Sequence, residues 1–161
     1  REGTANLFIF FCPRQGWRHI TVTEQRTKQD FAHQMKALVD VYFPKALQIR
    51  VVLDNLNTHS PTSLYETFEP AEARRILRRL EFHYTPVHAS WLNMVELELA
   101  VLSAQCLKRR IGSKATLRQE LWAWEAERNR KRATVDWRFT CHDARQGSNR
   151  QFTWTGIPSE N

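Results

Sequence analysis

The class of fold depends on the stretch Gln48-Ile49-Arg50-Val51-Val52-Leu53-Asp54-Asn55. Its first part is a short run rich in β-branched residues with a single charge, which is typical of a strand covered on both faces in the middle of a mixed or parallel sheet. Asp54 and Asn55 then begin a loop at the carboxyl end of that strand, where open α/β sheets bind their ligands. The stretch therefore predicts an α/β fold with a polar loop at one end of its sheet.

Apolar periodicity assigns the segments on either side of this strand. An apolar and aromatic run over residues 7–12, turn residues over 13–16 and alternation over residues 17–22 predict a β-hairpin or meander. A further strand is expected over residues 81–85, and helices are expected over residues 27–42, 71–79, 93–109 and 116–132. This order combines hairpin and crossover strands, so it predicts one α/β domain over residues 1–145. Residues 146–161 show no period and are expected to form an irregular tail.

The composition is that of a globular protein, since 42% of the residues are hydrophobic and 25% are charged. The longest apolar run, residues 7–12, is far shorter than the about 18 residues that a membrane span requires, so we expect a cytoplasmic protein without a membrane partner. Three widely spaced cysteines argue against a disulfide framework and against a cysteine zinc site. Lys and Arg number 24 against 17 Asp and Glu, and the net charge of +7 favours a polyanionic partner such as nucleic acid.

Two carboxylates are the first candidates for chemistry. Asp54 lies at a strand end, but its alternative is a structural turn in which the side chain hydrogen-bonds to the nearby backbone. Glu96 lies at the start of a predicted helix. Its alternative is a variant of the capping box, with Asn93 as the N-cap and the Glu96 carboxylate returning to the backbone of Asn93.

Glu96 also lies beside the apolar stripe of its helix, formed by Val95, Leu99, Leu102 and Cys106. We therefore expect the Glu96 carboxylate to face inward, where it needs a partner or a cation. Together Asp54 and Glu96 offer the oxygen ligands that Mg²⁺ and Mn²⁺ prefer. Two such ions can activate a nucleophile and stabilise a leaving oxygen when a phosphodiester is cleaved, which agrees with the basic charge of the chain.

The residues around these carboxylates resemble DDE transposases, in the bacterial insertion-sequence branch of the mariner superfamily. Two segments look like the second and third acidic motifs: Asp54-Asn55-Leu56-Asn57-Thr58-His59, then Tyr84-Thr85-Pro86 with Ser90-Trp91-Leu92-Asn93-Met94-Val95-Glu96. Residues 1–6, 121–129 and 135–139 are also similar to that branch, so the resemblance covers about residues 1–145.

The resemblance implies an RNase H-like mixed sheet flanked by helices, metal-dependent nicking of transposon ends, and strand transfer to target DNA by a 3′-hydroxyl. It implies Mg²⁺ or Mn²⁺ as the cofactor, double-stranded DNA as the partner, and a bacterial protein that lies at the nucleoid when bound to DNA; a homodimer is a candidate assembly. Asp54 matches the second catalytic and metal-binding carboxylate, and Glu96 matches the third. Glu98 is the weaker alternative to Glu96, because two helical positions turn a side chain by about 200°.

The first catalytic Asp of the family has no match in this sequence. In the family it lies on a central strand, paired between the strand of residues 7–12 and the strand before Asp54. The acidic residues before Asp54 do not fit such a strand: Glu2, Glu24, Asp30 and Asp40. We therefore expect the first, central strand to be missing and the chain to be catalytically impaired, as in a truncated or decayed gene copy. The alternative is an inactive remnant that binds DNA or itself.

Two basic stretches are candidates for DNA binding. Lys108, Arg109 and Arg110 follow the helix of Glu96 and are well placed to meet phosphates, which predicts salt-sensitive binding with little sequence preference. The group of Arg74, Arg75, Arg78 and Arg79 is expected to be a solvated helix face. We expect Trp124 and Cys106 to be core residues, whereas Trp122 points in another direction and could stack on a base. The spacing of His59, His83, His88 and Cys106 matches no zinc pattern.

Overall fold

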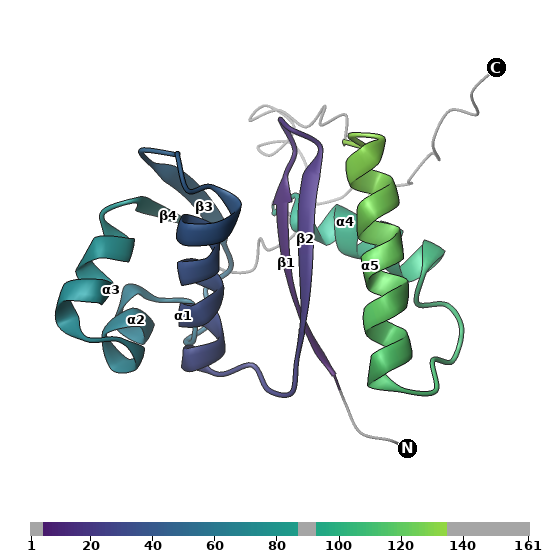
Figure 1. Ribbon diagram of the computed structural model, residues 1–161, viewed down its shortest axis with the longest axis horizontal. Coiled ribbons are helices and arrows are strands. Elements are labelled where there is room, and N and C mark those ends of the chain that lie inside the picture. The colour runs from purple at the N-terminus through teal and green to yellow at the C-terminus, as the bar shows by residue number, and fades with distance from the viewer. Residues whose placement is uncertain (1–4, 87–92, 135–161) are drawn as a thin grey trace.

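The computed structural model describes residues 5–86 and 93–134, and it begins with the predicted hairpin (Figure 1). Strand β1 (Asn6–Cys12) pairs antiparallel with β2 (Trp17–Thr23), so that Ile9 lies opposite Ile20. The turn between them needs Gly16, which has a φ of 60° and lies so close to Arg132 that a Cβ atom would overlap its backbone carbonyl.

The predicted helix over residues 27–42 is confirmed, with a change of winding near its end. Helix α1 (Lys28–Ala37) begins at a capping box, in which the Thr27 hydroxyl accepts from the backbone N–H of Asp30 at 3.1 Å and the Asp30 carboxylate accepts from the backbone N–H of Thr27 at 2.8 Å. The helix continues as one π-helical turn, η1 (Leu38–Tyr42), before the chain turns towards the next strand.

The second sheet contains β3 (Ile49–Leu53) and β4 (Leu80–Tyr84), which run parallel. Two short helices connect them, α2 (Pro61–Thr67) and α3 (Pro70–Leu77), and each has a proline in its first turn, where the missing N–H costs no hydrogen bond. Helical periodicity in the sequence predicted α3 but not α2. The expectation that β3 is covered on both faces is wrong: Ile49, Val51 and Leu53 face the core, whereas Arg50 and Val52 point to the other face, where Val52 is 55% exposed.

Two further helices pack on the hairpin. Helix α4 (Val95–Gln105) contacts β1, and α5 (Lys114–Arg130) contacts β2, so in Figure 1 the hairpin stands between these helices and α1. Ile20, Leu102, Cys106 and Leu121 form the buried core on this side, and Trp124 packs against them. A larger core joins α1, α2 and α3 to the β3–β4 sheet, with Phe8 and Phe10 of β1 packed against it.

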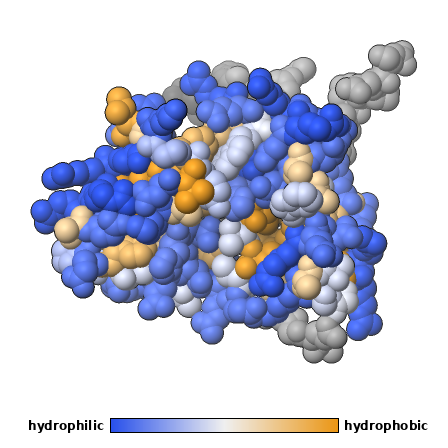
Figure 2. Space-filling view, viewed as in Figure 1, coloured by the Kyte–Doolittle hydropathy of each residue, from blue (hydrophilic) through white to orange (hydrophobic). Residues whose placement is uncertain are grey.

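The observed architecture is a mixed α/β fold with two small sheets, and it is compatible with an RNase H-like fold. Hydrophilic side chains cover most of the face shown in Figure 2. None of the helices in the described ranges is both long and apolar enough to cross a membrane. The tail expected over residues 146–161 lies outside the described residues.

Helix α5 also seals the free edge of β2. Asn129 accepts from the backbone N–H of Arg18 and donates to its carbonyl oxygen, both at 2.8 Å, and Glu125 accepts from the backbone N–H of Ile20 at 2.8 Å. These side chains give polar backbone groups of an edge strand the partners that a neighbouring strand would otherwise supply. The segment 121–129 therefore has a definite structural use, which the sequence analysis did not anticipate.

Candidate active site

Asp54 lies immediately after β3, at the carboxyl end of the parallel pair, as predicted. Its Oδ1 lies 2.6 Å from Nδ1 of His59, and its side chain is 38% exposed. The turn that follows is closed instead by the backbone, since the N–H of His59 donates to the carbonyl oxygen of Leu56 at 2.8 Å. Within the described residues no backbone N–H donates to the Asp54 carboxylate, which contacts the turn through the His59 side chain and remains accessible at the end of the sheet.

The loop that carries Asp54 is tied to the end of β4. The Asn55 amide donates to the carbonyl oxygen of Thr85, and the Tyr84 hydroxyl donates to the carbonyl oxygen of His59 at 2.8 Å. The backbone N–H of Thr85 donates in turn to the carbonyl oxygen of Leu53 at 2.9 Å. Thus residues 54–59 and 84–86, two of the segments that resemble the transposase motifs, meet at the carboxyl ends of β3 and β4.

Glu96 lies in the first turn of α4 and is exposed, so the expectation that it faces inward is wrong. The proposed capping box is also wrong: the Asn93 side chain accepts from the backbone N–H of Val95 at 3.2 Å, and no side-chain bond of Glu96 returns to Asn93. The apolar stripe did not distinguish Glu96 from the next glutamate. Glu98, and not Glu96, lies on the buried side of α4, because two positions along a helix turn a side chain by about 200°.

Glu98 lies instead in a buried charged cluster. Its Oε1 accepts from Nη2 of Arg18 at 3.2 Å and from Nη2 of Arg128 at 2.9 Å, and the side chains of Glu98 and Arg18 are fully buried. Burial lowers the pKa of the Arg18 guanidinium below its usual range, although the adjacent Glu98 opposes that shift. The cluster joins α4, α5 and β2, so the Glu98 carboxylate is committed to holding these elements together.

The two candidate metal ligands come from different elements, the end of β3 and the start of α4. Both carboxylates are accessible, and oxygen donors of this kind suit Mg²⁺ or Mn²⁺. Within the part of the chain that the structure describes, no group of three or more His, Cys, Asp or Glu side chains lies close enough to hold a metal ion. Each of the two carboxylates therefore suits a divalent cation in type, and no contact in the described ranges joins one to the other.

The basic residues after α4 lie on the surface. Lys108, Arg109 and Arg110 are all exposed, and Arg109 donates to Glu120 at 2.5 Å. Trp122 is 72% exposed on α5. These side chains are accessible to a ligand, as the sequence analysis expected.

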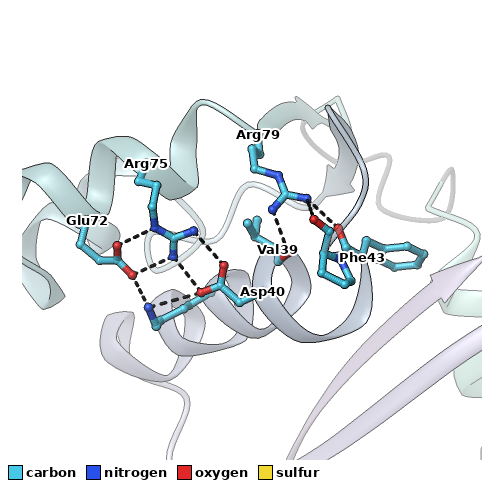
Figure 3. A network of polar contacts seen from close by, with 8 residues as sticks. Val39, Asp40, Phe43, Glu72, Arg75 and Arg79 are labelled. Atoms are coloured by element: carbon cyan, nitrogen blue, oxygen red, sulfur yellow. Dashed lines mark hydrogen bonds and ion pairs between the residues drawn. The ribbon is translucent and has the colours of Figure 1, made fainter.

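The basic residues of α3 have a different use, shown in Figure 3. Arg75 donates to both carboxylate oxygens of Asp40 at 2.8 Å and also to Glu72, and the bonds from Arg75 and Lys36 lower the pKa of Glu72 to about 2. Arg79, which follows α3, donates to the main-chain carbonyls of Val39 in η1 at 3.1 Å and of Phe43 just after it at 2.7 Å. Arg74, Arg75 and Arg78 are exposed, as expected of a solvated face, and Arg75 is also ion-paired there. Arg79 departs from that expectation, because it is only partly exposed and bonds to main-chain carbonyls.

Comparison with known families places the chain in a superfamily. A family model described as DDE superfamily endonuclease matches residues 1–118 of the chain. That range includes Asp54, Glu96 and the basic residues 108–110. Comparisons with curated proteins and with solved structures gave no match. Since the family model covers most of the 161 residues, the chain belongs to the DDE superfamily of endonucleases.

Proposed function

We propose that this chain is the catalytic domain of a DDE transposase, of the bacterial insertion-sequence branch of the mariner superfamily, which cleaves DNA and transfers the cut strand. The observation that carries the proposal is Asp54, whose accessible carboxylate lies at the carboxyl end of β3 within the range that the DDE superfamily model matches. The resemblance of residues 54–59 and 90–96 to the second and third acidic motifs supports the narrower assignment. Such a protein acts in the cytoplasm, at the nucleoid when bound to DNA.

In this proposal Asp54 and Glu96 bind Mg²⁺ or Mn²⁺. The bound metal would supply activation of a water or 3′-hydroxyl nucleophile and stabilisation of the leaving oxygen. Asp54 contributes a carboxylate that is 38% exposed at the carboxyl end of β3. Glu96 contributes an exposed carboxylate from the first turn of α4, where the helix dipole favours negative charge.

We propose further that an additional strand pairs between β1 and β3 and carries the first catalytic Asp. The N–H of Ile49 and the carbonyl oxygen of Leu53 bond towards the β4 side, so the backbone groups of Arg50 and Val52 point to the opposite edge. In the described ranges, no strand pairs with that edge of β3 or with the edge of β1 opposite β2. Edges of this kind are templates for pairing.

The alternative function follows from the same edges. Without a third carboxylate the chain would be impaired in cleavage, and it would act as a remnant that binds DNA or itself. Lys108 and Arg110 would then supply phosphate contacts without chemistry, and the open edge of β1 would supply a surface for a homodimer. The DNA contacts in both proposals are electrostatic and predict binding that weakens steeply with salt.

A plasmid-nicking assay with Mg²⁺ or Mn²⁺ tests the choice between the two. If the chain is an endonuclease, Asp54→Asn and Glu96→Gln each abolish metal-dependent nicking. The matched control is Glu66→Gln, which removes an exposed carboxylate that pairs with Lys28 and should leave nicking intact. Nicking that survives Asp54→Asn would refute the proposed site. Salt-sensitive binding to unrelated duplexes without any nicking would establish the remnant.

A further inference from the structure

The side chain of His59 contacts Asp54 but has no role in the function proposed above. Nδ1 of His59 lies 2.6 Å from Oδ1 of Asp54. The imidazole is mostly buried, since 16% of the His59 side chain is exposed against 38% of the Asp54 side chain. In this pair, therefore, the histidine is the buried partner and the carboxylate is the solvent-accessible one.

The position of His59 is fixed independently of Asp54. Its ring stacks on Phe31 of α1, with the ring centroids 4.9 Å apart and the planes inclined by 29°, and Phe31 is itself 3% exposed. The backbone of His59 donates to Leu56 and accepts from Tyr84, each at 2.8 Å. Contacts with the hydrophobic core and with the end of β4 thus hold the imidazole in the orientation in which it contacts the Asp54 carboxylate.

The contact also fixes the tautomer of the imidazole. An ionised carboxylate is only an acceptor, so a hydrogen bond at 2.6 Å requires the proton on Nδ1 of His59. The N–H then occupies Oδ1 of Asp54 and sets the rotation of the carboxylate. Among the described residues no donor contacts Oδ2, which leaves that oxygen for a cation. Partners of this kind orient metal ligands, and their loss typically lowers metal affinity about 10–100-fold.

We infer that His59 is a positioning residue, which orients the Asp54 carboxylate for a divalent cation through its Nδ1–H. The inference rests on the proposed function only in taking Asp54 as a metal ligand. His59 itself contacts neither metal nor DNA in this assignment. Its effect on metal binding comes from the direction of one N–H bond, and a side chain that restores that donor should restore most of the effect.

The chain offers a matched control on the neighbouring strand. Nε2 of His83 lies 2.6 Å from Oε1 of Glu81, which is the same separation as in the His59–Asp54 pair. Unlike His59, His83 is an exposed residue, with 51% of its side chain accessible, and its partner is not a proposed ligand. A substitution of His83 therefore removes a comparable contact without touching the site.

The first test measures Mn²⁺ affinity by electron paramagnetic resonance on the full chain. We expect Asp54→Asn to weaken Mn²⁺ binding and His59→Phe, which keeps a ring beside Phe31 but lacks the donor, to weaken it about tenfold. His59→Asn, whose amide N–H can replace Nδ1–H, should recover most of the affinity, and His83→Phe should bind as the unmodified chain does. Thermal unfolding of each metal-free variant shows whether it is folded.

The outcomes separate the inference from the function on which it rests. If Asp54→Asn binds Mn²⁺ normally, Asp54 is not a ligand and the proposed function fails at this residue. If Asp54→Asn weakens binding but His59→Phe does not, the inference fails and the function stands. Equal weakening by His59→Phe and His59→Asn would also overturn the inference, because the donor would then be irrelevant.

A second measurement uses the unmodified chain and does not depend on whether any variant folds. In the unmodified, metal-free chain at about pH 8, above the usual titration range of histidine, ¹⁵N chemical shifts distinguish a protonated ring nitrogen from an unprotonated one. We expect Nδ1 of His59 to carry the proton and Nε2 to lack it. The opposite tautomer would contradict the hydrogen bond to Asp54 on which the inference depends.

Discussion

Replacing Glu98 with glutamine removes one negative charge from the buried cluster and changes its shape very little. Arg18 has no exposed side-chain surface, and 14% of the Arg128 side chain is exposed, so water cannot compensate for the lost carboxylate at either guanidinium. We expect Glu98→Gln to destabilise the folded chain strongly, because the fully buried Arg18 and the mostly buried Arg128 would then face each other without the carboxylate that bridges them.

The magnitude follows from the burial of the pair. Removing one partner of a buried ion pair costs about 3–5 kcal/mol, which is a large part of the about 5–15 kcal/mol that stabilises a typical domain. For a chain of this size the midpoint of thermal unfolding shifts by about 2–4 °C per kcal/mol, so the expected fall is about 6–20 °C. The expected fall in the midpoint is therefore larger than the error of a thermal unfolding measurement.

Urea unfolding, followed by circular dichroism, measures this effect. The matched control is Glu127→Gln on α5, where the lost carboxylate is 48% exposed and pairs with Arg130 and Lys131 at the surface, so little change is expected. The dependence of the unfolding free energy on urea should keep its slope, since both variants bury similar surface. A Glu98→Gln protein no less stable than Glu127→Gln would refute the argument that this cluster is desolvated and holds α4 in place.

Three further outcomes are expected. Gly16→Ala should destabilise the chain by more than about 1 kcal/mol, because φ is positive there and a Cβ would overlap a carbonyl group beyond α5, whereas Gly112→Ala, with nothing within 4 Å, should be neutral or stabilising in thermal unfolding. Thr27→Ala should cost about 1 kcal/mol by removing the acceptor for the N–H of Asp30, and Thr27→Ser should retain most of it. Glu72 has a pKa lowered from 4.5 to about 2, so its contribution is present above pH 4.5 and is lost as the pH falls towards about 2. Glu72→Gln should flatten that part of the stability profile, and an unchanged profile would contradict the assignment.

Local patterns predicted those elements whose stability comes from local contacts. Alternation and turn residues identified the hairpin, and helical spacing identified α1, α4 and α5. Helix α2 was missed because it is seven residues long, and a helix that buries little more than Ser63 and Leu64 has no period to detect. The burial of β3 was misjudged because exposure of Val52 depends on what packs on its face of the sheet, and a run of apolar residues does not specify whether one face or both are covered.

The candidate site was predictable to the same extent. Asp54 could be selected because its position at the end of an apolar strand is a local feature. The choice between Glu96 and Glu98 depends on Arg18, which lies eighty positions earlier in the chain and meets Glu98 only after β2, α4 and α5 have packed. The contact between His59 and Asp54 spans five positions, but its meaning comes from Phe31 and the end of β4. Distant partners of this kind leave no mark in a single sequence.

The seal that Asn129 and Glu125 place on β2 limits how copies of the hairpin sheet can add to one another. A sheet with two open edges can lengthen indefinitely and form a fibre. Among the described residues, the backbone of Arg18 and Ile20 on β2 is already bonded while the outer edge of β1 pairs with no strand, so two copies joined edge to edge through β1 would present the sealed part of β2 at each end. Growth of that sheet would then stop at a symmetric pair, and mutations that loosen Asn129 would convert a self-limiting contact into an extendable one.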